Sequence, residues 1–250
     1  MSLNNLVWAV PKSSPILTDD EVHLWRASLE QPVSVVEALN AHLADDERER
    51  ADRLVFERDR RKFIVGRGVL REILAGYTGL SPSEIRFEYS LTNKPSLANQ
   101  TQSAELEFNL SHSNEVVLYA LTRRRLIGVD LEWLRPMPNA DSMVARYFSP
   151  AEIESFHRLS PAQREEGFFN GWTRKEAYVK ALGEGIGHPL DQFSVSLSPG
   201  EPARLTSVHN DPAQIERWLL HAFEPFPGYV AALIVEGQGW TCQSWEWRAT

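Results

Sequence analysis

The chain has 250 residues and a formal net charge of −8, with 42% hydrophobic and 24% charged residues. This is the composition of an ordinary globular protein, and the acidic balance argues against a nucleic-acid binder, which needs a broad basic surface. No apolar run approaches the ~20 residues of a membrane span, the N-terminus lacks the pattern of a signal peptide, and the single Cys242 excludes an internal disulfide. We therefore expect a cytoplasmic protein without a membrane segment.

Hydrophobic periodicity predicts a mixture of helices and strands along the chain. Helices are expected at Val35–Phe56, with an acidic break at Asp45 and Asp46, at Phe63–Ala75 and at Gln163–Leu182. Gly76 and Gly183 are the expected ends of the second and third helices. Strands are expected at Val22–Trp25, Ile85–Tyr89, Val116–Leu121, Leu126–Trp133, Phe193–Leu197, Trp218–Phe223, Tyr229–Val235 and Trp240–Trp247.

A locally basic region lies between Glu47 and Glu72, where nine basic residues stand against six acidic ones. One interpretation is a solvated helix crossed by salt bridges, which would account for most of these side chains. The other is a binding surface for an anionic ligand. The sequence leaves both open.

The segment Ile127–Glu132 reads as a strand in which Ile127, Val129 and Leu131 alternate with Gly128, Asp130 and Glu132. Because strand side chains repeat every two residues, Asp130 and Glu132 project from the same face. Such a pair is most often a solvated sheet face, but two adjacent carboxylates also suit a bound cation.

The segment Trp172–Lys180 reads as a helix in which Trp172, Glu176 and Lys180 form one stripe. Alone, this stripe is most simply surface charge. If the helix crosses the acidic face of the strand, three carboxylates and one ammonium converge. Three hard oxygen ligands with open positions suit Mg²⁺, which takes waters and substrate phosphates as its remaining ligands.

A third element, Phe108–Ser113, precedes the acidic strand, and the three elements together resemble a known family. Asn-Leu-Ser-His-Ser, then Ile-Gly-Val-Asp-Leu-Glu, then Trp-Thr-Arg-Lys-Glu-Ala-Tyr-Val-Lys is the order and spacing of the 4'-phosphopantetheinyl transferases. The resemblance is to the surfactin-synthetase-activating (Sfp) type, and it covers residues from about 47 to 195. It implies transfer of the phosphopantetheine arm of coenzyme A to a serine of an apo acyl or peptidyl carrier protein, with release of 3',5'-ADP.

The resemblance also implies an α+β fold of two similar halves, related by a pseudo-twofold axis, with the active site at the seam. We expect the halves to be residues 1–124 and 125–250. A faint internal repeat agrees, because helix, proline and strand recur after Gly76 and Gly183 at an offset of 107 to 108 residues. In the repeat, Asp130 falls opposite Ser244, so one metal site per chain is expected. We expect a monomer.

Residue roles follow from the resemblance. Asp130, Glu132 and Glu176 are the expected Mg²⁺ ligands, and Lys180 is the expected partner of the departing phosphate. Either Glu176 or a metal-bound water is the general base, and the sequence does not choose between them. The residues expected to bind coenzyme A are Arg48, Arg53, Arg61, Lys62, Lys94, Ser111 and His112.

Three side chains near these motifs carry further expectations. Glu152 is either a further acidic group of the site or a helix N-terminal acid after Ser149. Lys175 is expected to point to solvent or to the carrier. His112 is expected in a turn between two strands.

The segment before the third helix is expected to supply a carrier-docking surface with an apolar centre and a thin basic rim. Its members are Phe148, Phe156, His157, Leu159, Phe168 and Phe169 with Arg146, Arg158, Arg164 and Arg174. For Phe168 and Phe169 the alternative is burial in the core. Two other functions remain possible from the sequence, a non-catalytic carrier-binding protein and a Mg²⁺-dependent phosphohydrolase of nucleotides.

Overall fold

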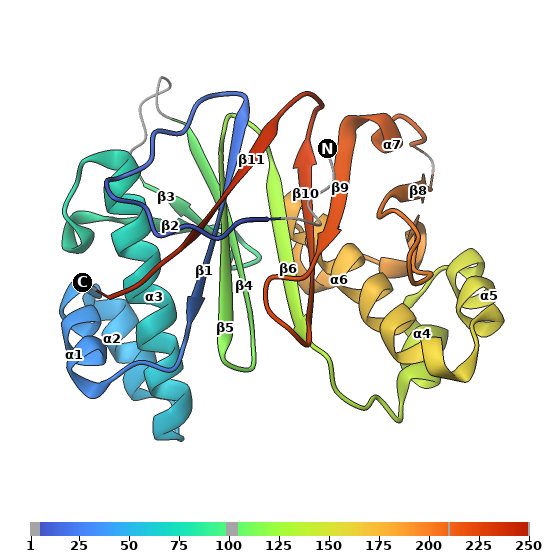
Figure 1. Ribbon diagram of the computed structural model, residues 1–250, viewed down its shortest axis with the longest axis horizontal. Helices are drawn as coiled ribbons and strands as arrows, with labels where there is room; N and C mark the ends of the chain where they lie inside the picture. Colours follow the sequence, from blue (N-terminus) through green and yellow to red (C-terminus); the bar gives the residue numbers. More distant parts are fainter. Residues whose placement is uncertain (1–5, 99–104, 210, 250) are drawn as a thin grey trace.

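The computed structural model describes residues 6–98, 105–209 and 211–249, and its N-terminal half places three helices against one side of a sheet (Figure 1). The sheet has the order β11-β1-β5-β4. Strand β1 runs antiparallel to β5 and parallel to β11. The elements of this half are β1 (Glu21–Ser28), α1 (Val33–His42), α2 (Asp45–Asp52), α3 (Glu57–Thr78), the short helix η1 (Pro82–Glu84), β2 (Phe87–Tyr89), β3 (Pro95–Leu97), β4 (Leu106–Ser113) and β5 (Val116–Arg123).

The C-terminal half packs one long helix, α6, against a three-stranded sheet of order β6-β10-β9, and β7 pairs separately with β8. Its elements are β6 (Ile127–Trp133), α4 (Ala140–Tyr147), α5 (Pro150–Arg158), η3 (Pro161–Gln163), α6 (Arg164–Leu182), η4 (Gly185–Gly187), η5 (Leu190–Gln192), β7 (Phe193–Val195), β8 (Leu205–Val208), α7 (Gln214–Arg217), β9 (Trp218–Phe223), β10 (Tyr229–Glu236) and β11 (Thr241–Glu246). The two sheets lie side by side in the centre of Figure 1, with the helices on the outer flanks.

One strand of the C-terminal half, β11, joins the N-terminal sheet. After the hairpin of β4 and β5, β6 crosses into the C-terminal sheet and pairs with β10. After the hairpin of β9 and β10, β11 crosses back and pairs with β1. Each half also runs from a long helix through a 3-10 turn to a short strand, α3 to β2 and α6 to β7. The predicted α+β fold of two similar halves is thereby confirmed.

Several predicted boundaries differ from the structure. The predicted helix Val35–Phe56 is interrupted at Leu43, which is extended, and α2 ends at Asp52. Gly76 lies inside α3, and Gly79 ends the helix in the left-handed conformation that glycine adopts without steric cost. The expectation that His112 lies in a turn is wrong, because His112 is in strand β4.

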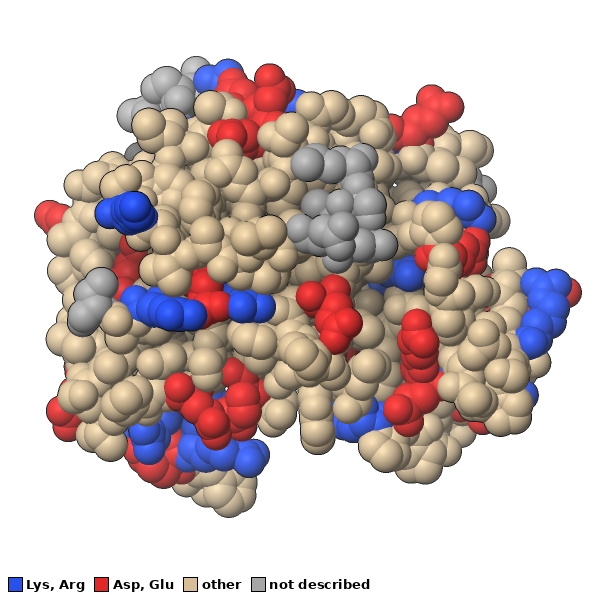
Figure 2. All heavy atoms as spheres, in the orientation of Figure 1, with Lys and Arg blue, Asp and Glu red and all other residues tan. Residues whose placement is uncertain are grey.

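Most basic side chains between Glu47 and Glu72 form salt bridges with neighbouring acids, which supports the solvated-helix interpretation for them. These pairs include Arg48 with Asp45, Arg58 with Asp59, Arg60 with Asp52 and Lys62 with Glu115, whereas the pair of Arg71 with Glu47 is buried. On the face shown in Figure 2, Lys and Arg are interspersed with Asp and Glu. Within the described residues, no helix is both long enough and apolar enough to cross a membrane.

A buried histidine in β1 makes stability depend on pH. His23 is fully buried, its Nδ1 lies 2.7 Å from the Tyr77 hydroxyl, and burial lowers its pKa to about 4. Because the folded pKa is below the unfolded value of about 6.5, the unfolded chain binds the proton more tightly. Stability from neutral His23 is therefore complete above pH 6.5 and falls as the pH drops toward 4.

We expect the unfolding free energy to fall by roughly 3 kcal/mol from this group between these pH values. Denaturant unfolding of the wild type and of His23→Gln, measured from pH 7.5 to 4.5, would show this. The variant should be less stable at pH 7.5, and its curve should be flatter. His157→Gln, at a half-exposed side chain, is the control and should follow the wild type. Parallel curves for His23→Gln and wild type would contradict the prediction.

Candidate active site

A cavity of about 780 Å³ opens at the seam between the halves, and residues of all three predicted motifs line it. Strand β4 contributes Ser111 and His112, strand β6 contributes Asp130 and Glu132, and helix α6 contributes Glu176 and Lys180. The three carboxylates and the ammonium therefore line one cavity, as expected. Other lining residues include Arg146, Tyr147, Trp172, Val179, His188 and Asp191.

Lys180 binds Asp130 directly. Its Nζ lies 2.6 Å from Asp130 Oδ1 and 2.9 Å from Ser111 Oγ, and it also donates to the carbonyl oxygen of Val129. Asp130 is 5% exposed, and its second oxygen, Oδ2, is buried without a hydrogen-bond partner. An unpaired buried carboxylate oxygen is costly, so Oδ2 is suited to a cation.

Glu176 lies in a negative environment. Burial raises the pKa of Glu176, and Asp130 and Glu132 raise it further, whereas Lys180 acts in the opposite direction. Its carboxylate is therefore a stronger base than an exposed glutamate. Glu132 is held by Ser113 and Arg135, which donate to its Oε2 over 2.9 and 3.1 Å.

These residues fit a hard divalent cation by their chemistry. They provide three carboxylates, and the Asp130 Oδ2 among their oxygens has no hydrogen-bond partner. Among the residues described, no three His, Cys, Asp or Glu side chains are gathered closely enough to hold a metal ion as they stand. Lys180 and Arg135 are bonded to two of the three carboxylates. A cation would have to compete with these side chains.

A second groove of about 410 Å³ adjoins the first, because Leu110 and His112 line both. Its apolar lining includes Leu54, Phe63, Pro95 and Val117, and its cations are Arg50, Lys62 and Arg67. An apolar wall beside three cations suits a ligand that has a flat ring and anionic groups.

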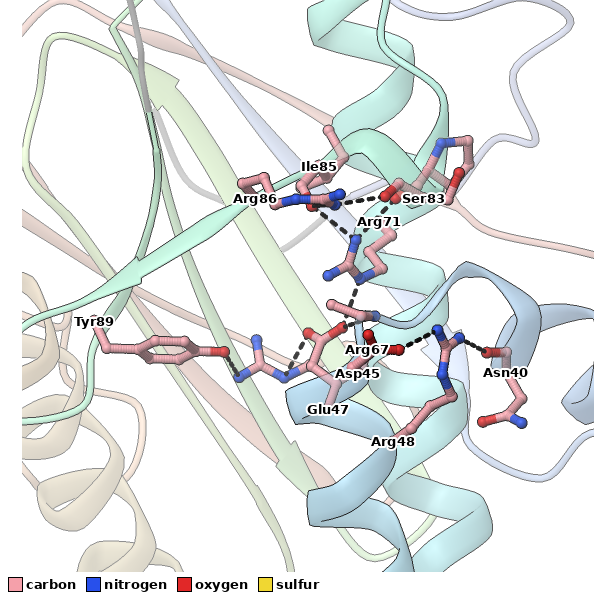
Figure 3. Close-up of polar contacts among 12 residues, drawn as sticks. Asn40, Asp45, Glu47, Arg48, Arg67, Arg71, Ser83, Ile85, Arg86 and Tyr89 are labelled. Atoms are coloured by element: carbon pink, nitrogen blue, oxygen red, sulfur yellow. Dashed lines mark hydrogen bonds and ion pairs between the residues drawn. The ribbon is translucent and has the colours of Figure 1, made fainter.

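Arg67 is oriented by a buried ion cluster, drawn in Figure 3. The Glu47 carboxylate lies between Arg71, whose Nε donates to it over 2.7 Å, and Arg67, whose Nε is 3.7 Å away. Arg67 also donates to the Tyr89 hydroxyl, and its Nη1 is buried without a hydrogen-bond partner. This cluster ties α2 to α3 and fixes one wall of the groove.

The structure brings only some predicted coenzyme A ligands to these two cavities. Ser111, His112 and Lys62 line them. Arg61 donates to the carbonyl oxygen of Gln31 and lines a separate cavity, whereas Arg48 bonds to Asp45 and Asn40 on α2 and α1. Arg53 is exposed at the end of α2.

Lys94, in the turn between β2 and β3, contacts the C-terminal end of α6. Its Nζ donates to the carbonyl oxygen of Ala181 over 3.3 Å, while Thr92 donates to that of Gly183 over 2.6 Å. Burial lowers the pKa of Lys94, and Glu107 acts in the opposite direction. The turn between β2 and β3 therefore caps the helix that carries Glu176 and Lys180.

The expectation that Lys175 points outward is wrong. Lys175 is fully buried, and its Nζ contacts both oxygens of Glu152 and the carbonyl oxygen of Phe193. Glu152 accepts from the backbone N–H groups of Ser149 and Val195, within a capping box that starts α5. The helix-terminal interpretation of Glu152 is therefore the one that the structure supports, because its oxygens are used in the core.

The predicted apolar centre of a carrier-docking surface is also wrong. Phe148, Phe156, Phe168 and Phe169 are at most 2% exposed and form the core between α4, α5 and α6. Arg174 is buried as well and donates to the carbonyl oxygen of Ser196. The aromatic side chains are numerous because this half needs its own core.

Several cavity residues were missed from the sequence. Arg50 and Arg67 were indistinguishable from the surrounding charges, and Tyr147 and His188 carry no motif. His188 Nδ1 lies 2.5 Å from Glu184 Oε2 at the cavity wall. The i,i+4 spacing of this pair was the one signal that could have found it.

We expect His112→Ala to raise the KM for coenzyme A by about tenfold or more while kcat is largely kept, because a hydrogen bond to a charged group contributes about 1.5–3 kcal/mol. His112 lies where the two cavities meet. Desolvation by the surrounding protein, and then Lys180 and Lys62, lower the pKa of His112, whereas Asp130 and Glu132 act in the opposite direction. Steady-state kinetics would test this, with His157→Ala as the control. A collapse of kcat at unchanged KM would give His112 a role in the reaction instead.

Comparisons with known proteins identify the family. Residues 126–234 match the family model of the 4'-phosphopantetheinyl transferase superfamily, and residues 23–123 match that of the N-terminal part of a 4'-phosphopantetheinyl transferase. The chain is 42% identical to the 4'-phosphopantetheinyl transferase HetI of Nostoc sp. (strain PCC 7120), over 96% of this chain and 98% of that protein. It is 31% identical to psf-1 of Bacillus pumilus, over 74% and 77%, and 26% identical to Sfp of Bacillus subtilis (strain 168), over 79% and 84%.

The chain therefore belongs to the 4'-phosphopantetheinyl transferase superfamily. It is an enzyme of the Sfp type, which transfers the phosphopantetheine arm of coenzyme A to a carrier protein.

Proposed function

We propose that this transfer is Mg²⁺-dependent and takes place in the seam cavity. The observation that carries the proposal is the convergence of Asp130, Glu132, Glu176 and Lys180 on one cavity. Asp130, Glu132 and Glu176 would hold the ion. When bound, Mg²⁺ would neutralise charge on the pyrophosphate as its phosphoanhydride bond breaks.

The side chains of this enzyme would move the protons of the reaction. Glu176 would accept the proton from the carrier serine hydroxyl as its oxygen attacks the phosphorus of the phosphopantetheinyl group. Lys180 would stabilise the leaving oxygen of 3',5'-ADP through its Nζ. The serine–phosphorus bond forms while the phosphoanhydride bond breaks, and the proton is left on Glu176.

Coenzyme A would extend from the seam cavity into the adjoining groove. Ser111 and His112 would contact its pyrophosphate, and Arg50, Lys62 and Arg67 would face its nucleotide end. Arg48, Arg53, Arg61 and Lys94 lie outside the lining of these two cavities, and any contact from them would require a side-chain movement.

The carrier serine, of an acyl or a peptidyl carrier protein, would enter from the open side of the seam cavity. We further propose a monomer in the cytoplasm, divided after residue 124, a position that agrees with the two segments matched by the family models.

Mass spectrometry of an apo carrier protein incubated with the enzyme, coenzyme A and Mg²⁺ tests the proposal. The expected result is a carrier heavier by one phosphopantetheine arm, and 3',5'-ADP that appears only when carrier is present. Release of nucleotide without carrier would favour a phosphohydrolase. Carrier binding without modification would favour a scaffold. Full activity in EDTA would overturn the Mg²⁺ dependence.

A further inference from the structure

The two central sheets meet at their edge strands, β4 and β6, which lie side by side in Figure 1. Strand β4 pairs with β5 on its other side, and β6 pairs with β10. An edge strand presents backbone N–H groups that need acceptors when they are buried. The residues that supply those acceptors bear directly on the active site.

Three side chains of β4 accept the edge N–H groups of β6, and we call this set the seam ladder (Asn109, Ser111 and Ser113). Val129 N–H donates to Asn109 Oδ1 over 2.9 Å, Leu131 N–H to Ser111 Oγ over 3.3 Å, and Trp133 N–H to Ser113 Oγ over 3.1 Å. The sequence separation is constant, so the strands run in the same direction and in register. The Asn-x-Ser-x-Ser pattern therefore places one acceptor at each step.

The two serines of the ladder also bind the carboxylates. Ser111 Oγ donates to Asp130 Oδ1 and Ser113 Oγ donates to Glu132 Oε2, both over 2.9 Å. Each hydroxyl thus fixes a carboxylate and the backbone N–H of the next residue at the same time. Because a hydroxyl has one hydrogen and two lone pairs, it can satisfy both partners.

Of the two carboxylates of β6, Glu132 depends more on such a support. Its side chain is 21% exposed, whereas that of Asp130 is 8% exposed and is also held by Lys180. Its other polar contact is Arg135, a side chain that is 40% exposed. An exposed arginine restrains a partner weakly, so Ser113, which is half-buried and whose hydroxyl is also held by the Trp133 N–H, is the contact that sets the orientation of Glu132.

We propose that Ser113 is a positioning residue for the transfer, which holds Glu132 in the orientation required for metal binding. This inference rests on the proposed Mg²⁺ site. Groups that orient a metal ligand typically contribute about 10–100-fold to metal affinity or activity. Ser113 would act through Glu132 without touching the substrate.

The test is the affinity of each variant for Mg²⁺, measured by calorimetry without carrier. Ser113→Ala should raise the dissociation constant for Mg²⁺ by about tenfold or more, and Ser113→Thr, which keeps the hydroxyl, should restore it. In kinetics, the Mg²⁺ concentration for half-maximal rate should rise in parallel, while the KM for coenzyme A and kcat at saturating Mg²⁺ stay near wild type. Ser96→Ala, which removes a hydroxyl from β3, is the matched control.

Asp130→Asn, measured alongside, separates this inference from the proposed function. Weak Mg²⁺ binding in Asp130→Asn together with wild-type binding in Ser113→Ala would overturn the role of Ser113 and leave the metal site intact. Wild-type binding in both variants would overturn the metal site, and the role of Ser113 with it. Failure of Ser113→Thr to restore binding would also refute the inference, since the hydroxyl is the group that it invokes.

Discussion

Asp130→Asn and Glu176→Gln should each lower kcat by roughly 100-fold or more, the order of effect found when one preorganised electrostatic group is removed from an active site. Both changes keep the size of the side chain and remove its negative charge. Asp130 contacts Lys180 and Ser111, and Glu176 shares the cavity with both carboxylates of β6. Steady-state rates with apo carrier, at Mg²⁺ concentrations up to saturation, would measure the loss.

Although Glu176→Gln should lower kcat, it should not lower the stability of the fold. Because the folded pKa of Glu176 lies above its ordinary value of 4.5, its ionised form destabilises the fold at neutral pH. Without Mg²⁺ the variant should therefore be at least as stable as wild type at pH 7.5, and the difference should vanish below about pH 4.5. A thermal melt at each pH would show this. Glu165→Gln, an exposed residue of the same helix, is the matched control, and near wild-type rates for Glu176→Gln would remove Glu176 from the mechanism.

Gly128→Ala should disrupt the site through the backbone. A Cβ atom at Gly128 would lie 2.0 Å from the carbonyl oxygen of Ala177 and 2.6 Å from the amide nitrogen of Ala181. These are helix backbone atoms, so α6 would have to move away from β6. The displacement would separate Glu176 and Lys180 from Asp130. Overpacking of this kind costs about 1–3 kcal/mol or more, and we expect a larger proportional loss of kcat than of stability.

Denaturant unfolding and kinetics on the same preparation would separate the two effects. Gly66→Ala is the control for stability, because a Cβ there would lie 3.7 Å from its nearest neighbour, a side-chain atom of Leu29. Since alanine is favoured over glycine inside a helix, this control should be as stable as wild type or more so. An active and fully stable Gly128→Ala enzyme would show that α6 and β6 do not need this close approach.

The sequence determined the parts of this enzyme that depend on local periodicity. The alternation in Ile127–Glu132 predicted that Asp130 and Glu132 share a face, and the helical spacing predicted the stripe of Trp172, Glu176 and Lys180; all five side chains line one cavity. The helix end at Gly183 was also predictable, because its left-handed conformation favours glycine. These features need only the geometry of one strand or one helix.

Tertiary structure decided the features that require knowing which elements meet. Lys175 and Glu176 are adjacent in the chain, yet one is buried against Glu152 and the other faces the cavity, because α6 is enclosed on both sides. The burial of Phe168 and Phe169 follows in the same way from the packing of α4 and α5.

The seam ladder shows most clearly what the sequence determined and what only the packing decided. The sequence shows Asn109, Ser111 and Ser113 at alternate positions, but their partners lie 19 and 20 residues away on another sheet. Hydrogen bonds between two edge strands depend on how the halves pack. The periodicity of a single strand or helix does not specify that packing. The sequence thus determined which side chains share one face, and the packing of the two halves decided what holds them in place.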